Sequence, residues 1–186
     1  MVTATQVKEL RELTGAGIME CKRALEESDG DVTQATNLLK QQGLAKAAKK
    51  AGRSASQGVV EPYVHAGGRI ASLVEVNCET DFVARTPDFQ TLSHDVAMQV
   101  AAMNPRYVSE DEIPADAWGA LEREFGSRDL ALAAVSLLHQ SFIKNPKATI
   151  RDLINEAIAK LGENIIVRRF ARFEVGAGLP ASAPEE

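Results

Sequence analysis

The side chains best suited to chemistry in this sequence are three histidines, two cysteines and a group of carboxylates near residue 80. His65, His94 and His139 lie far apart in the chain. None of them belongs to an HExxH or HxH pattern, and no acidic cluster at ligand spacing accompanies them. We therefore expect a structural or surface role for each histidine.

The carboxylates Glu75, Glu79 and Asp81 do not form a recognisable acid–base pair. Glu75 and Glu79 fall in a stretch where charged and apolar residues alternate, and nothing in the pattern assigns an acid role to one carboxylate and a base role to another. The glycine pairs at 15–17 and 66–68 match neither a phosphate-binding loop nor a dinucleotide fingerprint, and no GxSxG elbow occurs. The sequence thus predicts no enzyme activity, no metal site and no cofactor.

Composition places the chain among soluble globular proteins, with 186 residues, 45% apolar residues and a net charge of −5. That charge argues mildly against a nucleic-acid binder. Cys21 and Cys78 have no second cysteine nearby, which favours buried, reduced thiols in a cytosolic protein. No apolar run is long enough to span a membrane, and the opening MVTATQVKEL resembles no targeting peptide. We expect a cytoplasmic protein without membrane contact.

One short stretch, NCETDFVART at residues 77–86, stands out because it sets Asp81 beside Phe82 where a strand pattern gives way to a helix pattern. Two readings are open. Phe82 folds back into the core, as most aromatic residues do, or it is held out at an exposed corner.

The first 42 residues carry three short helical patterns, separated by TGAG at residues 14–17 and SDGD at residues 28–31. Thr3 and Gln6 have capping-box spacing at the first of them. Three such helices predict a small bundle near the lower size limit for independent folding, which suits docking better than catalysis. Met19, beside the TGAG turn, is either a core residue or an adaptable contact.

Residues 43–57 predict a linker whose first half is helical. The linker holds a basic cluster, made of Lys46, Lys49, Lys50 and Arg53. This cluster is either a solvated face or a contact for RNA or an acidic protein. An RNA- or ribosome-associated adaptor that uses it is the alternative function.

Residues 58–176 predict an α+β domain with a small antiparallel sheet. The stretch at 59–78 alternates with period two around an Ala-Gly-Gly turn, which predicts a hairpin with Pro62 on an edge strand. Helices are expected from Pro87 onward, over 116–125, over 127–140 and over 150–161.

The stretch at 165–175 predicts a further strand of this domain, and the residues after it predict a tail. In the strand, Val167, Ala171, Phe173 and Val175 form the expected buried face, and the opposite face is made of Arg168, Phe170, Arg172 and Glu174. The tail at 177–186 contains no core-forming residues and is expected to be disordered.

Four segments together resemble translation elongation factor Ts. They are KELRELTGAGIMECKRALEESDGD at 8–31, LAKAAKKAGR at 44–53, LVEVNCETDFVART at 73–86 and KLGENIIVRRFARFEV at 160–175. They occur in the expected order, and the likeness extends from about Val7 to Val175. The chain is similar to the shorter bacterial form, with an abbreviated helical hairpin between Ala120 and Gln140.

The resemblance implies a guanine-nucleotide exchange factor for elongation factor Tu, a GTPase. It implies that the N-terminal bundle is similar to ubiquitin-associated (UBA) domains and docks on the nucleotide-binding domain of the GTPase. Carried over onto this sequence, the docking contacts are Leu13, Ile18 and Met19.

The resemblance also assigns a role to the TDFV motif, which is Thr80, Asp81, Phe82 and Val83 in this chain. In the family this segment dislodges Mg²⁺ from the GTPase site. Shorter members typically form homodimers through the core domain, which implies a complex of two factors with two GTPases. No specific nucleic-acid binding is expected.

Overall fold

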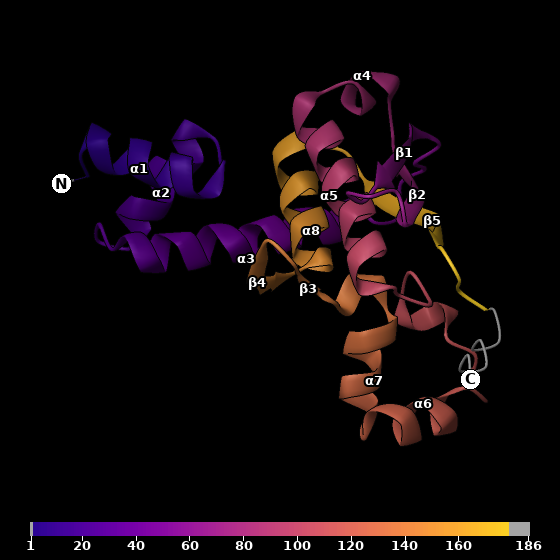
Figure 1. Cartoon of the computed structure of the whole chain (residues 1–186). Coiled ribbons are helices and arrows are strands. Elements are labelled where there is room, and N and C mark those ends of the chain that lie inside the picture. Colours follow the sequence, from indigo (N-terminus) through magenta and orange to yellow (C-terminus); the bar gives the residue numbers. More distant parts are fainter. Residues whose placement is uncertain (1, 179–186) are drawn as a thin grey trace, which may run out of the picture.

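The computed structural model describes residues 2–178, which form a mixed α+β fold (Figure 1). The first three helices are α1 (Ala4–Thr14), α2 (Ile18–Glu27) and α3 (Val32–Lys50). The elements that follow are β1 (Gln57–Val64), β2 (Ile70–Cys78), α4 (Asp81–Ala84), α5 (Pro87–Met103), η1 (Glu110–Glu112), α6 (Trp118–Phe125), α7 (Arg128–Val135), η2 (Leu137–His139), β3 (Ser141–Phe142), β4 (Asn145–Thr149), α8 (Ile150–Leu161) and β5 (Ile165–Glu174).

Helices α1, α2 and the first part of α3 form an N-terminal bundle with its own core. The predicted capping box is confirmed, because Gln6 N donates to Thr3 Oγ1 at 3.2 Å and Thr3 N donates to Gln6 Oε1 at 2.9 Å. Buried apolar side chains fill the centre of the bundle; they are Leu10, Cys21, Ala24, Leu25, Ala35 and Leu39.

Helix α3 runs unbroken from the bundle into the rest of the molecule (Figure 1). Ala35 and Leu39 belong to the bundle core, whereas Ala47 is buried in the main core. The boundary expected at residue 42 therefore lies inside this helix. As expected, the first half of the segment 43–57 is helical, and only residues 51–56 lack regular structure.

A three-stranded antiparallel sheet in the order β1-β2-β5 is the centre of the core domain. The predicted hairpin is confirmed: His65 N donates to Ile70 O at 2.8 Å across a turn in which Gly67 and Gly68 have positive φ. Pro62 lies on an edge strand, as predicted. Helices α5 and α8 cover one face of the sheet and bury the main core against it (Figure 1).

The predicted buried face of the last strand is wrong beyond Val167. A β-bulge interrupts the pairing of β2 with β5, because Glu75 pairs with Arg169 while Val76 pairs with Val167, leaving Arg168 as an extra residue. One extra residue exchanges the two faces of a strand. Phe170 therefore packs against the core, whereas Phe173 is 66% exposed and Val175 is also exposed.

The helix predicted over 127–140 ends early, at Val135. Ser136 is extended, and the next two N–H groups leave the helical ladder: Leu137 N donates to Tyr107 O at 2.9 Å and Leu138 N to Val108 O at 3.0 Å. The short hairpin of β3 and β4 follows, which the sequence analysis did not predict. Of the tail expected at 177–186, only the first two residues lie within the described part of the chain, and they form a turn.

Candidate functional site

The TDFV motif forms the corner between β2 and α5. Thr80 caps the four-residue helix α4 by accepting a hydrogen bond from Val83 N at 3.4 Å. Asp81 accepts from the Arg85 guanidinium at 2.7 Å. Val83 packs against the main core and Ala84 is buried, whereas Phe82 is 77% exposed.

The exposure of Phe82 follows from the geometry of α4. Successive helical residues point about 100° apart, so a single turn that buries Val83 and Ala84 directs Phe82 outward. The reading in which Phe82 folds back into the core is therefore wrong. The four motif residues have separate tasks in the free protein: Thr80 caps, Asp81 pairs with a neighbour, Val83 packs, and Phe82 is exposed to solvent.

The TGAG turn displays the second set of candidate residues. Gly15 ends α1 with φ of +66°, a left-handed conformation that glycine adopts without strain. Gly17 begins α2, and its N–H donates to Glu20 Oε2 at 3.2 Å. Leu13 and Met19 are each 71% exposed, and Ile18 is exposed as well. Packing of Met19 in the core is thereby excluded.

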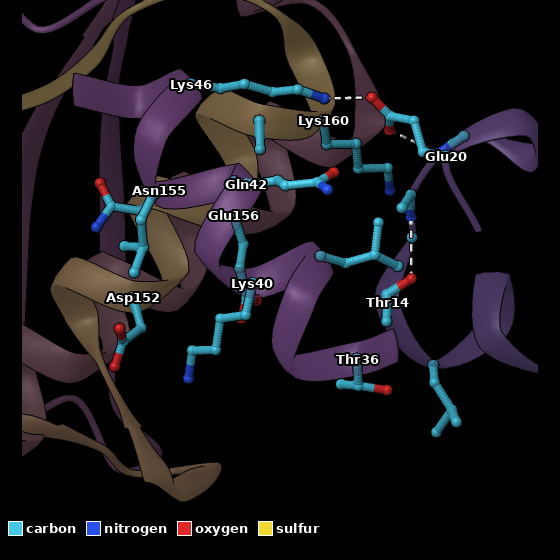
Figure 2. Close-up of a pocket in the computed structure, with 18 residues that line it drawn as sticks. Thr14, Glu20, Thr36, Lys40, Gln42, Lys46, Asp152, Asn155, Glu156 and Lys160 are labelled. Atoms are coloured by element: carbon cyan, nitrogen blue, oxygen red, sulfur yellow. Dashed lines mark hydrogen bonds and ion pairs between the residues drawn. The ribbon is translucent and has the colours of Figure 1, made fainter. Parts of the chain in front are cut away.

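A hollow of about 400 Å³ separates this turn from α8, and its lining residues are drawn in Figure 2. Across it, Lys46 of α3 forms an ion pair with Glu20 of α2. The hydrogen bond from Lys46 holds the pKa of the Glu20 carboxyl below its ordinary value. This pair connects the TGAG turn to α3 and so helps to fix the orientation of the exposed Leu13 and Met19.

The two exposed sets lie apart: α1 and α2 stand on one side of the molecule, whereas α4 lies over the top of α5 (Figure 1). The structure therefore does not bring Leu13 and Met19 together with Phe82 in one site. It presents two separate surfaces on one connected scaffold.

The histidines form no common site in the structure. His65 lies 3.3 Å from the Tyr63 hydroxyl, His94 pairs with Glu61 at 3.1 Å, and His139 Nδ1 is 2.9 Å from Ser136 Oγ. Within residues 2–178, no group of three or more His, Cys, Asp or Glu side chains is arranged to hold a metal ion. In the same residues, no helix is long and apolar enough to cross a membrane.

The two cysteines are buried with free thiols, as expected. Cys78 lies at the end of β2, directly before the corner, and its Sγ donates to Thr80 O at 3.1 Å. Burial raises the pKa of the Cys78 thiol, and the nearby Glu163 carboxylate acts in the same direction.

Part of the basic cluster at 46–53 is engaged in ion pairs. Lys46 pairs with Glu20, and Arg53 NH1 lies 3.6 Å from Glu79 Oε1. These two cations connect α3 and the following segment to α2 and to the end of β2. The pairing favours a structural role for Lys46 and Arg53.

The sheet face opposite α5 and α8 is apolar and exposed, a feature the sequence analysis missed. Cross-strand neighbours form two rows on it, Val64–Ala71–Phe173 and Pro62–Leu73–Ala171. Val64, Leu73 and Phe173 are all exposed. The bulge at Arg168 places Phe173 here, and the adjacent Arg168 and Arg169 interrupt the alternation of residues 165–175 at that point.

Comparison with known proteins gives one consistent answer. The family model described as "Elongation factor TS" matches residues 22–126. The elongation factor Ts of Carboxydothermus hydrogenoformans is 51% identical over 96% of this chain and 91% of its own length. That of Thermoanaerobacter sp. (strain X514) is 46% identical over the full length of both chains. That of Geobacter sulfurreducens is 47% identical over 96% of this chain and 91% of its own length. With the TDFV corner and the TGAG turn in the places described, the chain belongs to the elongation factor Ts family.

Proposed function

We propose that this protein is a guanine-nucleotide exchange factor that binds elongation factor Tu in its GDP form and promotes GDP release in the cytoplasm. The observation that carries the proposal is the exposed Phe82 on a single helical turn whose neighbours are packed or hydrogen-bonded. The protein would catalyse no chemical reaction, because exchange changes only which nucleotide is bound.

The two exposed sets would act in sequence on the GTPase. The UBA-like N-terminal bundle would dock first, through Leu13, Ile18 and Met19, which are exposed apolar side chains that gain free energy when an interface removes them from water. Docking brings the TDFV corner against the nucleotide site.

At the nucleotide site, Phe82 would act as a wedge. Mg²⁺ requires near-ideal octahedral geometry and joins the nucleotide phosphates to the protein. A ring inserted between elements of the GTPase needs to move them only slightly to disturb that geometry. Asp81 supports the corner through Arg85 and is not proposed as a metal ligand, because one carboxylate on a passing partner competes poorly for a buried ion.

The required energy is modest. Exchange catalysis is reciprocal coupling: if the factor weakens GDP binding by some ratio, GDP weakens factor binding by the same ratio. A hundredfold effect corresponds to about 2.7 kcal/mol. One well-placed aromatic side chain can supply this amount.

The core domain would form a homodimer through the exposed face of its sheet, giving a complex of two factors with two GTPases. The rows around Leu73 and Phe173 supply an exposed, apolar surface. Two such faces can pack on each other as the sheets of a β-sandwich do. The face lies opposite α5 and α8, so pairing through it leaves the helical side of the core domain uncovered.

The test is release of a fluorescent GDP from elongation factor Tu in the presence of excess unlabelled nucleotide. We expect the protein to accelerate release in a saturable manner, and to hydrolyse no nucleotide by itself. Release at the spontaneous rate across the full concentration range would contradict the proposal.

A further inference from the structure

The carboxylate of Glu163 receives three hydrogen bonds from the residues that begin the TDFV corner. Oε2 accepts from Glu79 N at 3.1 Å and from Thr80 N at 2.9 Å, and Oε1 accepts from the Thr80 hydroxyl at 2.6 Å. Glu163 lies in the turn between α8 and β5, more than 80 residues away in the sequence. The corner is therefore attached to a distant part of the core.

The attachment is reciprocal. Glu79 Oε1 accepts from Asn164 N at 2.7 Å, so each segment supplies a carboxylate to the backbone of the other. Asn164 is buried, and its Nδ2 donates to Ala51 O at 3.4 Å and to Arg53 O at 2.8 Å. Three segments thus meet at one point: the end of β2, the turn after α8, and the residues that follow α3.

The corner needs such an attachment, because α4 cannot hold its own shape. A helix of four residues gains too few internal hydrogen bonds to offset the entropy of ordering its backbone. Phe82 adds nothing, since its side chain is exposed. Hydrogen bonds to a charged acceptor are among the stronger ones available to a backbone N–H.

We infer that Glu163 is a positioning residue for nucleotide exchange: it holds Glu79 and Thr80 so that Phe82 is presented in a fixed orientation before the partner arrives. This inference rests on the proposed function. A wedge that is already ordered loses less entropy on insertion than a flexible one. In this role Glu163 acts through Phe82 and makes no contact of its own with the nucleotide site of the GTPase.

The first test compares Glu163→Ala, Glu163→Gln and the wild type in the fluorescent GDP assay. If Glu163→Ala leaves about one molecule in ten with the corner in place, the maximal exchange rate falls about tenfold, because only the competent fraction acts. The concentration for half-maximal effect should stay nearly constant, since the N-terminal docking surface is untouched.

Glu163→Gln should retain most of the activity, because its amide oxygen can still accept from both backbone N–H groups. We expect a loss below about threefold for this variant. Glu124→Ala is the matched control. The Glu124 carboxylate lies on α6, remote from the corner, and accepts a hydrogen bond from Arg106 NH1 at 2.9 Å. Loss of this carboxylate should not alter the rate of GDP release.

A double-mutant cycle with Phe82→Ala separates positioning from a direct contact. If Glu163 acts through Phe82, Glu163→Ala should cause no further loss once Phe82 is absent. Full additivity would overturn the inference, and so would an unchanged rate in Glu163→Ala. A wild-type protein that fails to accelerate GDP release would refute the proposed function. That result differs from full additivity and from an unchanged rate in Glu163→Ala, which would refute only the positioning role.

Amide hydrogen exchange tests the inference without the partner. In Glu163→Ala the N–H groups of Glu79 and Thr80 should exchange about tenfold faster or more, whereas those of α5 keep their protection. Glu163→Gln should keep the protection of the Glu79 and Thr80 N–H groups as well as that of α5. Unchanged protection at Glu79 and Thr80, in a folded Glu163→Ala protein, would overturn the positioning role.

Discussion

The backbone of Gly58 passes so close to the carbonyl oxygen of Val76 that a Cβ built on Gly58 would lie 2.1 Å from that oxygen. Gly58 also has φ of +147°, within the range that L side chains rarely adopt. Both facts concern the start of β1, where Gly58 pairs with Asn77 immediately before the TDFV corner.

Gly58→Ala should therefore destabilise the protein by roughly 2–4 kcal/mol, because both strain and a backbone clash must be relieved. Chemical denaturation gives this free energy of unfolding. Gly119→Ala in α6 is the control: open space surrounds it, and an alanine there should be neutral or stabilise by up to about 1 kcal/mol. Equal stability of the two variants would contradict the close approach.

Phe82→Ala should slow partner-dependent GDP release by about tenfold or more, as expected for an aromatic hot spot. Because Phe82 is exposed, the melting temperature should stay within a few degrees of that of the wild type. Met103→Ala is the control, because it truncates an exposed apolar side chain at the end of α5 far from the TDFV corner. This variant should accelerate GDP release as the wild type does. An unchanged rate in Phe82→Ala would refute the wedge.

Joint replacement of Leu13 and Met19 by alanine should raise the half-maximal concentration for exchange about tenfold, with the maximal rate little changed. These substitutions test docking better than a deletion of residues 1–42, which would cut α3 in its middle. Leu130→Ala, at an exposed position on α7, serves as the control. If docking does not depend on Leu13 and Met19, the plots of GDP release rate against factor concentration will be the same for the double variant and the wild type.

Phe173→Arg should convert a dimer into a monomer, because a charge within an apolar face must be desolvated for two faces to pack. Sedimentation equilibrium measures the mass directly. The variant should remain folded, since Phe173 is exposed, and Met103→Arg should leave the mass unchanged. A monomeric wild type, or a Phe173→Arg protein that is still dimeric, would rule out this face as the interface.

His139 should make stability depend on pH. Burial lowers the pKa of His139, and the Arg151 guanidinium acts in the same direction. Between the folded-state pKa and the unfolded value of about 6.5, the unfolded chain binds more protons, so stability falls as pH falls through this window. Denaturation midpoints from pH 8 to pH 5 should show a smaller slope in His139→Gln. Parallel curves would refute this assignment.

Local sequence signals predicted the elements whose ends depend on neighbouring residues. The Thr3–Gln6 capping box, the TGAG stop and the Ala-Gly-Gly turn each act within a few residues, and all three occur in the structure. The exposure of Phe82 could be chosen over burial only through the family resemblance. Composition alone favours a buried ring.

Features that depend on distant partners could not be read from local patterns. The bulge at Arg168 changes which side of β5 faces the core. Arg168 and Arg169 interrupt the alternation there, but only the pairing with β2 shows that the two faces exchange. Ser136 ends α7 because carbonyls of residues 107 and 108 compete for the next N–H groups. Glu163 looked like an ordinary residue after a helix, and only the fold shows that it binds the backbone of residues 79 and 80.

The unbroken course of α3 has a consequence for how the two exposed surfaces would reach a common partner. Nineteen helical residues span about 28 Å, and a helix of this length resists bending far more than a flexible tether does. The distance between the TGAG turn and the TDFV corner is therefore nearly constant. If the two surfaces dock as proposed, a partner is held at both points only when its own surfaces match that spacing, and α3 would then select partners by distance.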